Sequence, residues 1–256
     1  MVRGQKILIF SGPGAENIDF YANRAMEKAG FGDTKGAISD MDKVIEMDPK
    51  YFNAYYNRGN LKSRIGDCNG AIADLNEAIK ITPYLPYALF LRGLCKKQIN
   101  DYSGALKDYD KAIEYDSLFV NAYVNRGNLK GDLKDFSGAI SDLDEALKLD
   151  PNNVLAIGNR GKIKTDLKDY REAIKDLNKA IELNPNHSKA YNNLGNILQE
   201  KGNIEEKYKT MYRQHVAPPI RRRNDELQCR QLGPGFGAPN AKAMGKIKLD
   251  KGRGVI

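Results

Sequence analysis

The chain has 256 residues, of which 29% are charged and 41% are hydrophobic, so it is long enough to bury a core. Its three cysteines lie far apart, at positions 68, 95 and 229, and their odd number and spacing argue against a disulfide framework. Two isolated histidines cannot complete a zinc site, so we expect no metal and no cofactor.

The formal net charge of +8 is not spread evenly along the chain. Residues 207–256 hold 12 Lys and Arg against 3 Asp and Glu, whereas the preceding 206 residues are close to neutral. Basic character is therefore a property of the C-terminal tail, and any argument from positive charge concerns that segment.

The first 17 residues are predicted to be a partly flexible N-terminal extension. Their apolar run, ILIF, is too short for the core of a signal peptide, and no later stretch approaches the length of a membrane span. Together with the unpaired cysteines, this predicts a soluble protein of a reducing compartment, the cytoplasm.

From residue 18 to about residue 201 the sequence repeats itself with a period of 34 residues. Small residues recur at fixed positions, and prolines keep the same phase except at Ser117. Such a period predicts an array of structural repeats. The glycines of the series are Gly59, Gly93, Gly127, Gly161 and Gly195, and the alanines are Ala37, Ala71, Ala105, Ala139 and Ala173.

Each unit is predicted to be a helical hairpin. In the unit that begins at residue 52, the helical pattern breaks at Gly66 and Asp67, resumes, and ends at Pro83. The glycine suits a left-handed C-terminal cap, and the aspartate suits the N-cap of the second helix. Gly59 is small enough to let the two helices approach closely. The aspartates at the capping position are Asp33, Asp67, Asp101, Asp135 and Asp169.

A 34-residue helical hairpin with an aromatic fourth residue, Gly eighth, Ala twentieth and twenty-seventh, and Pro thirty-second resembles the tetratricopeptide repeat. The units begin at residues 18, 52, 86, 120, 154 and 188. The second half of the sixth unit departs from the pattern, because Lys207 replaces an expected alanine, and we interpret it as a variant hairpin half or capping helix.

The resemblance implies an all-α fold, a right-handed α-solenoid of helix-turn-helix repeats. This repeat domain is expected to cover residues 18–217. A basic, glycine-rich and flexible tail is expected over residues 218–256.

Arginine occupies the seventh position of five repeats, where this family usually has a packed leucine. Each of these repeats also carries an aspartate at its twenty-third position. A charge in a packed interface needs a partner, so we expect a structural ladder of ion pairs along the array, with a row of ligand-binding arginines as the alternative. The arginines are Arg24, Arg58, Arg92, Arg126 and Arg160, and the aspartates are Asp40, Asp74, Asp108, Asp142 and Asp176.

The resemblance also implies that the second, fifth, sixth and ninth residues of each first helix face a concave groove. The sixth and ninth positions are mostly asparagine, whose amide both donates and accepts hydrogen bonds, as an extended peptide requires. We expect peptide binding there; a merely solvated helix face is the alternative. The predicted groove residues are Asn23, Asn57, Asn60, Asn125, Asn128, Asn159, Lys162, Asn193 and Asn196.

Apolar residues interrupt this polar row in and around the third repeat. They predict a contact of some kind: a pocket for an apolar side chain of the peptide, an additional core contact, or a self-association surface. The residues of this predicted patch are Tyr56, Tyr87, Phe90, Leu91, Leu94 and Val124.

Two known functions are not expected: binding of a chaperone C-terminus and catalysis. Family members that hold the C-terminal carboxylate of chaperones share basic residues at the fifth position of one repeat and the sixth of a later one, and no fifth or sixth position is basic here. The glycine-rich SGPGAENI lacks the lysine of a phosphate-binding loop, and no catalytic Ser, His and Asp set stands out, so we expect no enzymatic activity.

The sequence therefore predicts a protein-interaction module, acting as an adaptor, scaffold or assembly factor that binds a protein or peptide partner. Two alternatives remain open at this point. One is an RNA- or anionic-surface-associated protein that uses the basic tail. The other is a self-associating scaffold, a homo-oligomer formed through the apolar patch of the third repeat.

Overall fold

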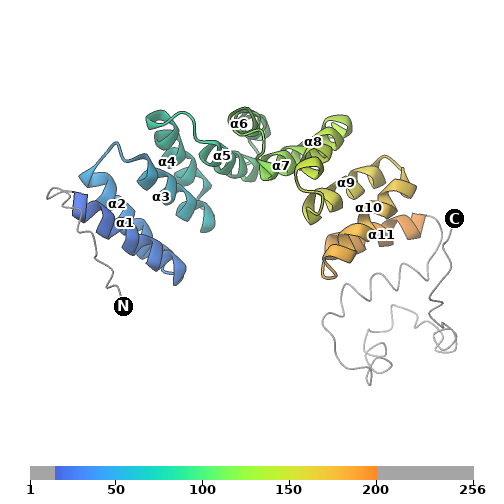
Figure 1. Cartoon of the computed structure of the whole chain (residues 1–256), viewed down its shortest axis with the longest axis horizontal. Coiled ribbons are helices and arrows are strands. Elements are labelled where there is room, and N and C mark those ends of the chain that lie inside the picture. Colours follow the sequence, from blue (N-terminus) through green and yellow to red (C-terminus); the bar gives the residue numbers. More distant parts are fainter. Residues whose placement is uncertain (1–14, 201–256) are drawn as a thin grey trace, which may run out of the picture.

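The structure is a computed structural model that describes residues 15–200. Within this range it contains eleven α-helices and no strand (Figure 1). The predicted second half of the sixth repeat and the predicted tail lie outside the described residues. The first helices of the hairpins are α1 (Ala15–Gly30), α3 (Phe52–Arg64), α5 (Pro86–Gln98), α7 (Val120–Asp132), α9 (Val154–Asp166) and α11 (Ser188–Glu200); the second helices are α2 (Thr34–Met47), α4 (Cys68–Ile81), α6 (Tyr102–Tyr115), α8 (Phe136–Leu149) and α10 (Tyr170–Leu183).

The second helix of each hairpin begins at the predicted aspartate cap. Asp67, for example, accepts a hydrogen bond of 2.9 Å from the backbone N–H of Gly70. A Cβ at Gly70 would lie 2.2 Å from the Asp67 carboxylate, which explains the glycine there. In the fifth repeat Glu172 takes this place, and its N–H lies 3.4 Å from the Asp169 carboxylate.

The turn between the two helices requires one residue with positive φ. The expected glycine supplies it twice, at Gly32 with φ 86° and Gly66 with φ 83°. The next three repeats place Asn100, Lys134 and Lys168 in this conformation, with φ of 65°, 68° and 63°. The hairpin therefore forms without a glycine at this position.

Close packing inside each hairpin depends on the glycine at the eighth position. A Cβ on Gly59 would lie 3.1 Å from Leu75 Cγ and 3.2 Å from the carbonyl oxygen of Ala71, so only a glycine fits without a shift. Ala71, Leu75 and Ala78 are fully buried on α4. The same pattern recurs along the array, which gives a narrow core that runs through all the described hairpins.

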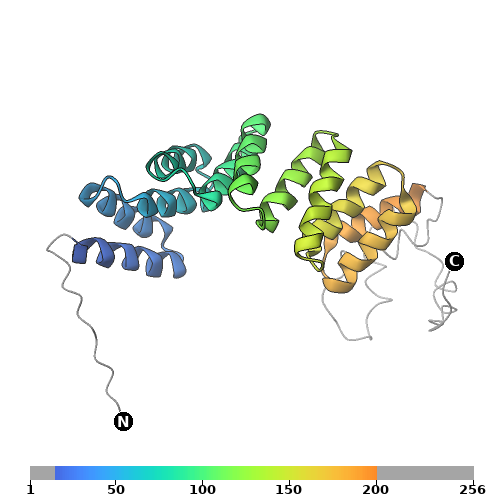
Figure 2. The same cartoon turned by 45° about the horizontal axis from the view of Figure 1, so that its top comes forward.

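The hairpins stack in sequence order into an arch, with α1 and α11 at its ends and α6 at its crown (Figure 1). Figure 2 shows that the arch also twists along its length. Three pairs of successive odd-numbered helices contact each other, α3 with α5, α7 with α9 and α9 with α11, whereas no pair of described even-numbered helices makes a comparable contact. The odd-numbered helices thus lie on the inner side of the arch, and we call the surface they form the inner face.

Candidate functional site

The arginine of each hairpin binds the aspartate of the same hairpin in a bidentate ion pair. In the fourth repeat, Arg126 Nη2 lies 2.6 Å from Asp142 Oδ1, and Arg126 Nε donates to Asp142 Oδ2 at 2.9 Å. All five of these carboxylates are buried. The equivalent pairs are Arg24 with Asp40, Arg58 with Asp74, Arg92 with Asp108, and Arg160 with Asp176.

Each buried carboxylate also binds a lysine that the sequence analysis missed. Lys130 Nζ lies 2.9 Å from Asp142 Oδ2, one helical turn beyond Arg126 on α7. The signal was present, because a lysine occupies the eleventh position of five repeats. These lysines are Lys28, Lys62, Lys96, Lys130 and Lys164.

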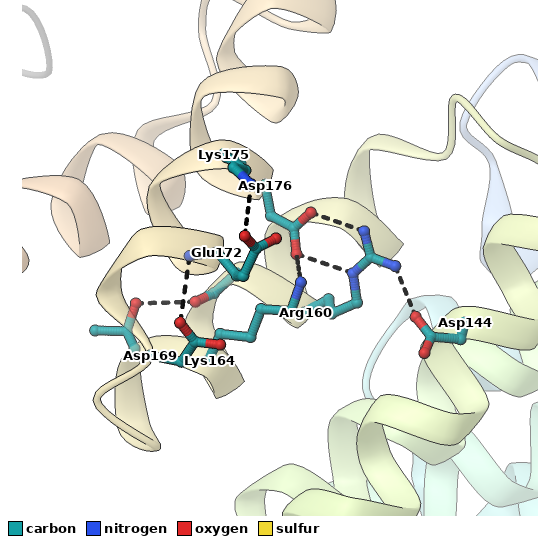
Figure 3. A network of polar contacts seen from close by, with 9 residues as sticks. Asp144, Arg160, Lys164, Asp169, Glu172, Lys175 and Asp176 are labelled. Atoms are coloured by element: carbon teal, nitrogen blue, oxygen red, sulfur yellow. Dashed lines mark hydrogen bonds and ion pairs between the residues drawn. The ribbon is translucent and has the colours of Figure 1, made fainter. Parts of the chain in front are cut away.

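The third hydrogen bond of the arginine reaches the preceding hairpin. Figure 3 shows Arg160 lying between Asp176 of α10 and Asp144 of α8, while Lys164 binds the second oxygen of Asp176. The Arg160 Nη1–Asp144 Oδ1 distance is 2.6 Å. One arginine therefore connects three helices across a repeat boundary, which is a structural role.

The ladder lowers the pKa of two of its carboxylates, Asp40 and Asp176. The hydrogen bond from the Arg24 guanidinium, helped by Lys28, lowers the pKa of Asp40 to about 2 despite burial. For Asp176, burial acts to raise the pKa, but the bonds from Arg160 and Lys164 outweigh it and the pKa is lowered. These arginines are therefore engaged with carboxylates and are not a free row for a ligand.

The predicted groove asparagines lie on odd-numbered helices and none of them is buried. Asn125 uses part of its amide locally, because its Nδ2 donates to the backbone oxygen of Asn121 at 2.9 Å. The other asparagine side chains of the set form no hydrogen bond with another described residue, so their amides are open to a ligand. They are Asn23, Asn57, Asn60, Asn128, Asn159, Asn193 and Asn196.

Lys162, the one cation of the predicted set, is already paired. Its Nζ lies 3.1 Å from Asp132 Oδ1, and Lys97 Nζ lies 3.5 Å from the other oxygen of the same carboxylate. We call Lys97, Asp132 and Lys162 the lysine–aspartate triad; it connects α5, α7 and α9. The sequence analysis missed Lys97 and Asp132, because their pairing depends on how neighbouring hairpins are offset.

Two residues of the predicted apolar patch belong to the core instead. Val124 is only 4% exposed and packs in a core cluster with Leu143 and Ile163. Phe90 is half-buried, with ring centroids 5.9 Å from Tyr109 and 4.9 Å from Phe119. The fifth position lies where the next hairpin packs, so an apolar side chain there is covered.

The rest of the patch keeps some exposure. Tyr87 is 59% exposed and its ring lies 4.7 Å from that of Phe119. Tyr56 is half-buried, and burial, followed by an electrostatic effect of Tyr87, raises the pKa of Tyr56. Leu91 and Leu94 are also half-buried on α5, and Leu94 packs, as Phe90 does, against the core cluster that contains Tyr109 and Leu129. We call Tyr56, Tyr87, Leu91 and Leu94 the aromatic–leucine cluster.

Two further classes of site are absent between residues 15 and 200. No group of three or more His, Cys, Asp or Glu is placed to hold a metal ion in that part of the chain. No helix within it combines the length and the apolarity needed to cross a bilayer.

Family comparisons match the repeats seen in the fold. Tetratricopeptide repeat models match residues 18–51, 52–84 and 86–117 and, in a second model, residues 120–153. A third model, described as TPR repeat, matches residues 161–202. No curated protein matches the sequence.

Several solved structures are similar to the fold. The crystal structure of the MamA protein is 23% identical with a TM-score of 0.61, over 68% of this chain and 96% of that one. YrrB, described as a TPR protein with an unusual peptide-binding site, is 20% identical with a TM-score of 0.59, over 71% and 97%. A tetratricopeptide repeat protein from Parabacteroides merdae ATCC 43184 is 17% identical with a TM-score of 0.70, over 79% and 81%. At these identities the similarity concerns the fold alone.

Proposed function

We propose that this chain, which belongs to the tetratricopeptide repeat family of protein-interaction modules, binds an extended peptide segment of a partner protein on its inner face. Its role would be that of an adaptor, scaffold or assembly factor. The repeat fold typically serves as a non-catalytic scaffold, and the inner face offers hydrogen bonds rather than nucleophiles or paired acids.

The observation that carries the proposal is the row of uncommitted amides. An asparagine side chain has two N–H donors and a carbonyl acceptor, and an extended peptide presents backbone donors and acceptors at regular intervals. Asn57, Asn128 and Asn159 stand on successive or nearby hairpins, are half-exposed, and have no hydrogen-bond partner among the described residues. The charged residues of the ladder, in contrast, are engaged with one another.

The aromatic–leucine cluster adds a place for an apolar side chain of the peptide. Tyr87 presents most of this surface, since Phe90 is held between Tyr109 and Phe119. The peptide-binding site named for YrrB supports the proposal only by analogy of fold. Amide contacts would hold the backbone of the peptide, and the cluster would select one side chain.

The test uses random peptides displayed on phage and selected on the full-length chain. Selected peptides are then titrated against Asn57→Ala/Asn128→Ala/Asn159→Ala. Each lost amide bond nets about 1 kcal/mol, so we expect the triple variant to bind about a hundredfold more weakly. The matched control, Asn69→Ala/Asn152→Ala/Asn178→Ala, changes three exposed asparagines away from the inner face and should bind like the parent.

Circular dichroism checks that both triple variants keep the helical fold. Equal binding by the inner-face triple variant and the parent would overturn the proposal. Self-association through the aromatic–leucine cluster is tested by sedimentation of the free chain with and without Tyr87→Ala. If this change converts a dimer to a monomer and leaves peptide affinity unchanged, the cluster is a self-association contact.

A further inference from the structure

The lysine–aspartate triad differs from the ladder in its balance of charge. In the fourth repeat the ladder sets Arg126 and Lys130 against two carboxylates, Asp142 and Asp110. In the triad, two lysines share the single carboxylate of Asp132. The triad therefore has a net charge of +1, and its lysines form no ion pair with any other described carboxylate.

Two of the three triad side chains are more exposed than the buried ladder carboxylate Asp142. The side chains of Asp132 and Lys162 are each 42% exposed, whereas the ladder carboxylate Asp142 is 5% exposed. Lys97 Nζ lies 3.5 Å from Asp132, the longer of the two contacts, so Lys97 is the lysine that is held less firmly. Lys162 is the exposed cation of the triad, whereas Lys97 is 25% exposed, and the two ammonium groups together can bind an anionic group of a ligand.

The place of the triad on the inner face ties it to the proposed peptide. Lys162 occupies the ninth position of its repeat, the same position as Asn60, Asn128 and Asn196 in the amide row. Lys97 follows Leu94 of the aromatic–leucine cluster by three residues, about one turn of α5. An anion bound at the triad would therefore belong to the same ligand that the asparagines and the cluster contact.

We infer that the partner segment carries an acidic side chain, an Asp or Glu, that binds Lys97 and Lys162 close to the residue held by the aromatic–leucine cluster. This inference rests on the proposed function and adds the chemistry of the partner. The acidic group is an internal side chain rather than a terminal carboxylate, because the amide row continues on both sides of the triad. Asn57 and Asn60 precede it, and Asn193 and Asn196 follow it.

Asp132 has two opposed effects in this arrangement. In the free protein it holds both lysines on the inner face, and in the complex its charge repels the incoming carboxylate. Removal of that charge should therefore strengthen the binding of acidic peptides. Loss of a salt bridge usually weakens binding, whereas removal of the Asp132 charge should strengthen it, so the direction of the change in affinity tests the inference.

The experiment starts from the phage selection of random internal peptides on the full-length chain. We expect an enrichment of Asp or Glu near an apolar residue, and loss of that enrichment with Lys97→Gln/Lys162→Gln. The matched control, Lys80→Gln/Lys148→Gln, removes the same charge from lysines on α4 and α8 that pair with Glu77 and Glu145, and it should keep the enrichment.

A selected peptide is then synthesised with a blocked C-terminus, together with a copy in which the acidic residue is replaced by its amide. Exposed ion pairs contribute up to about 1 kcal/mol each, so the acidic peptide should bind about fivefold more tightly than its amide copy. Asp132→Asn should tighten binding of the acidic peptide several-fold. Glu114→Gln is the control, since Glu114 is exposed on α6, away from the odd-numbered helices, and pairs with no described lysine.

The outcomes separate this inference from the proposed function. One contrary outcome is that the selected peptides depend on the asparagines but show no preference for Asp or Glu. Another is that the preference for Asp or Glu persists in Lys97→Gln/Lys162→Gln. Either result would overturn the inference and leave the proposed function standing. Selection of peptides that do not depend on the asparagines would overturn both. Dependence on the lysines only when the peptide has a free C-terminus would overturn the assignment to an internal side chain.

Discussion

Arg92 Nη1 donates a hydrogen bond of 2.7 Å to the side-chain oxygen of Asn76 in the preceding hairpin. At the other boundaries where this bond is seen, the acceptor is a carboxylate. The pairs are Arg58 with Asp42, Arg126 with Asp110, and Arg160 with Asp144. The boundary between α4 and α5 therefore has a hydrogen bond from a cation to a neutral amide where these other boundaries have an ion pair.

Asn76→Asp should stabilise the array, because it converts the hydrogen bond from Arg92 into an ion pair. The site is exposed, so we expect a gain of about 0.5 kcal/mol, seen as a higher urea midpoint of the helical circular dichroism signal. The matched control is Asn178→Asp. It lies at the same repeat position, but Leu194 replaces the arginine of the following repeat, so it should give no gain. Equal gains in both variants would mean that the pairing with Arg92 is not the cause.

The two aspartates that bind Arg126 should differ greatly in their contribution. Asp142 is buried and binds both Arg126 and Lys130, so Asp142→Asn leaves Lys130 without a carboxylate and Arg126 with only the exposed Asp110, and it should cost about 3 kcal/mol. The Asp110 side chain is 57% exposed, and Asp110→Asn should cost less than about 1 kcal/mol. Urea denaturation of both variants measures the difference. Similar losses would show that burial does not set the strength of these pairs.

Much of the fold was predictable from the sequence, because each hairpin is specified by local signals repeated every 34 residues. Gly59, Asp67 and Pro83 mark the helix contact, the start of the second helix and its end, and the pairing of Arg58 with Asp74 follows from their positions within one hairpin. The fold class and the repeat family were both predicted in this way.

Contacts between hairpins were less predictable, since they depend on the offset and twist from one repeat to the next. The bond from Arg58 to Asp42 and the triad around Asp132 both cross such a boundary. The burial of Val124 has the same origin, because Ile163 of the following hairpin packs in its core cluster. The asparagine groove stays a prediction, as no ligand contact on this chain tests it.

The stability of the first hairpin should fall in acid because of Asp40. Its pKa is lowered to about 2 in the folded state, against about 3.9 in an unfolded chain. A carboxylate with a lowered pKa contributes its stability above the unfolded value, and this contribution is lost as the pH falls from about 4 to about 2.

Asp40→Asn should therefore be less stable than the parent at neutral pH, and the difference between the two should shrink between about pH 4 and pH 2. Urea midpoints measured across this range give the comparison. Asn69→Ala, an exposed change without a carboxylate, should keep a constant offset from the parent. A constant offset for Asp40→Asn as well would contradict the lowered pKa.

The hydroxyl of Tyr109 is buried and has no hydrogen-bond partner among the described residues. Burial raises its pKa, so the group stays neutral, but its desolvation is not compensated. Tyr109→Phe should stabilise the chain by about 1 kcal/mol in thermal or urea unfolding. Tyr102→Phe is the control, because the exposed Tyr102 hydroxyl donates to Asn100 Oδ1 at 2.7 Å and its loss should give no gain. A loss of stability in Tyr109→Phe would show that the hydroxyl has a partner in solution.

Tyr109 also makes its hairpin less tolerant of a methyl group at the glycine of the helix contact. A Cβ on Gly93 would lie 2.7 Å from Cε1 and 2.9 Å from Cδ1 of Tyr109, whereas a Cβ on Gly59 would lie 3.1 Å from Leu75 Cγ. The Tyr109 ring is fully buried and has no room to turn away. Gly93→Ala should therefore destabilise the chain by about 2 kcal/mol, and Gly59→Ala by less, since the added methyl is partly offset by the better helix propensity of alanine.

The clash should become smaller when Tyr109 is replaced by leucine, the residue found at the equivalent places Leu75, Leu143 and Leu177, because a Cβ on the corresponding glycines would lie 2.9 to 3.1 Å from these leucines. Tyr109→Leu alone leaves unfilled space beside Gly93 and should destabilise the chain. Gly93→Ala/Tyr109→Leu should then be more stable than the sum of the two single changes predicts, by about 1 kcal/mol or more, because the new methyl occupies that space. Urea denaturation of the four proteins closes this double-mutant cycle. Additive effects would mean that the ring of Tyr109 moves freely, and that its contact with Gly93 does not limit how closely α5 and α6 approach.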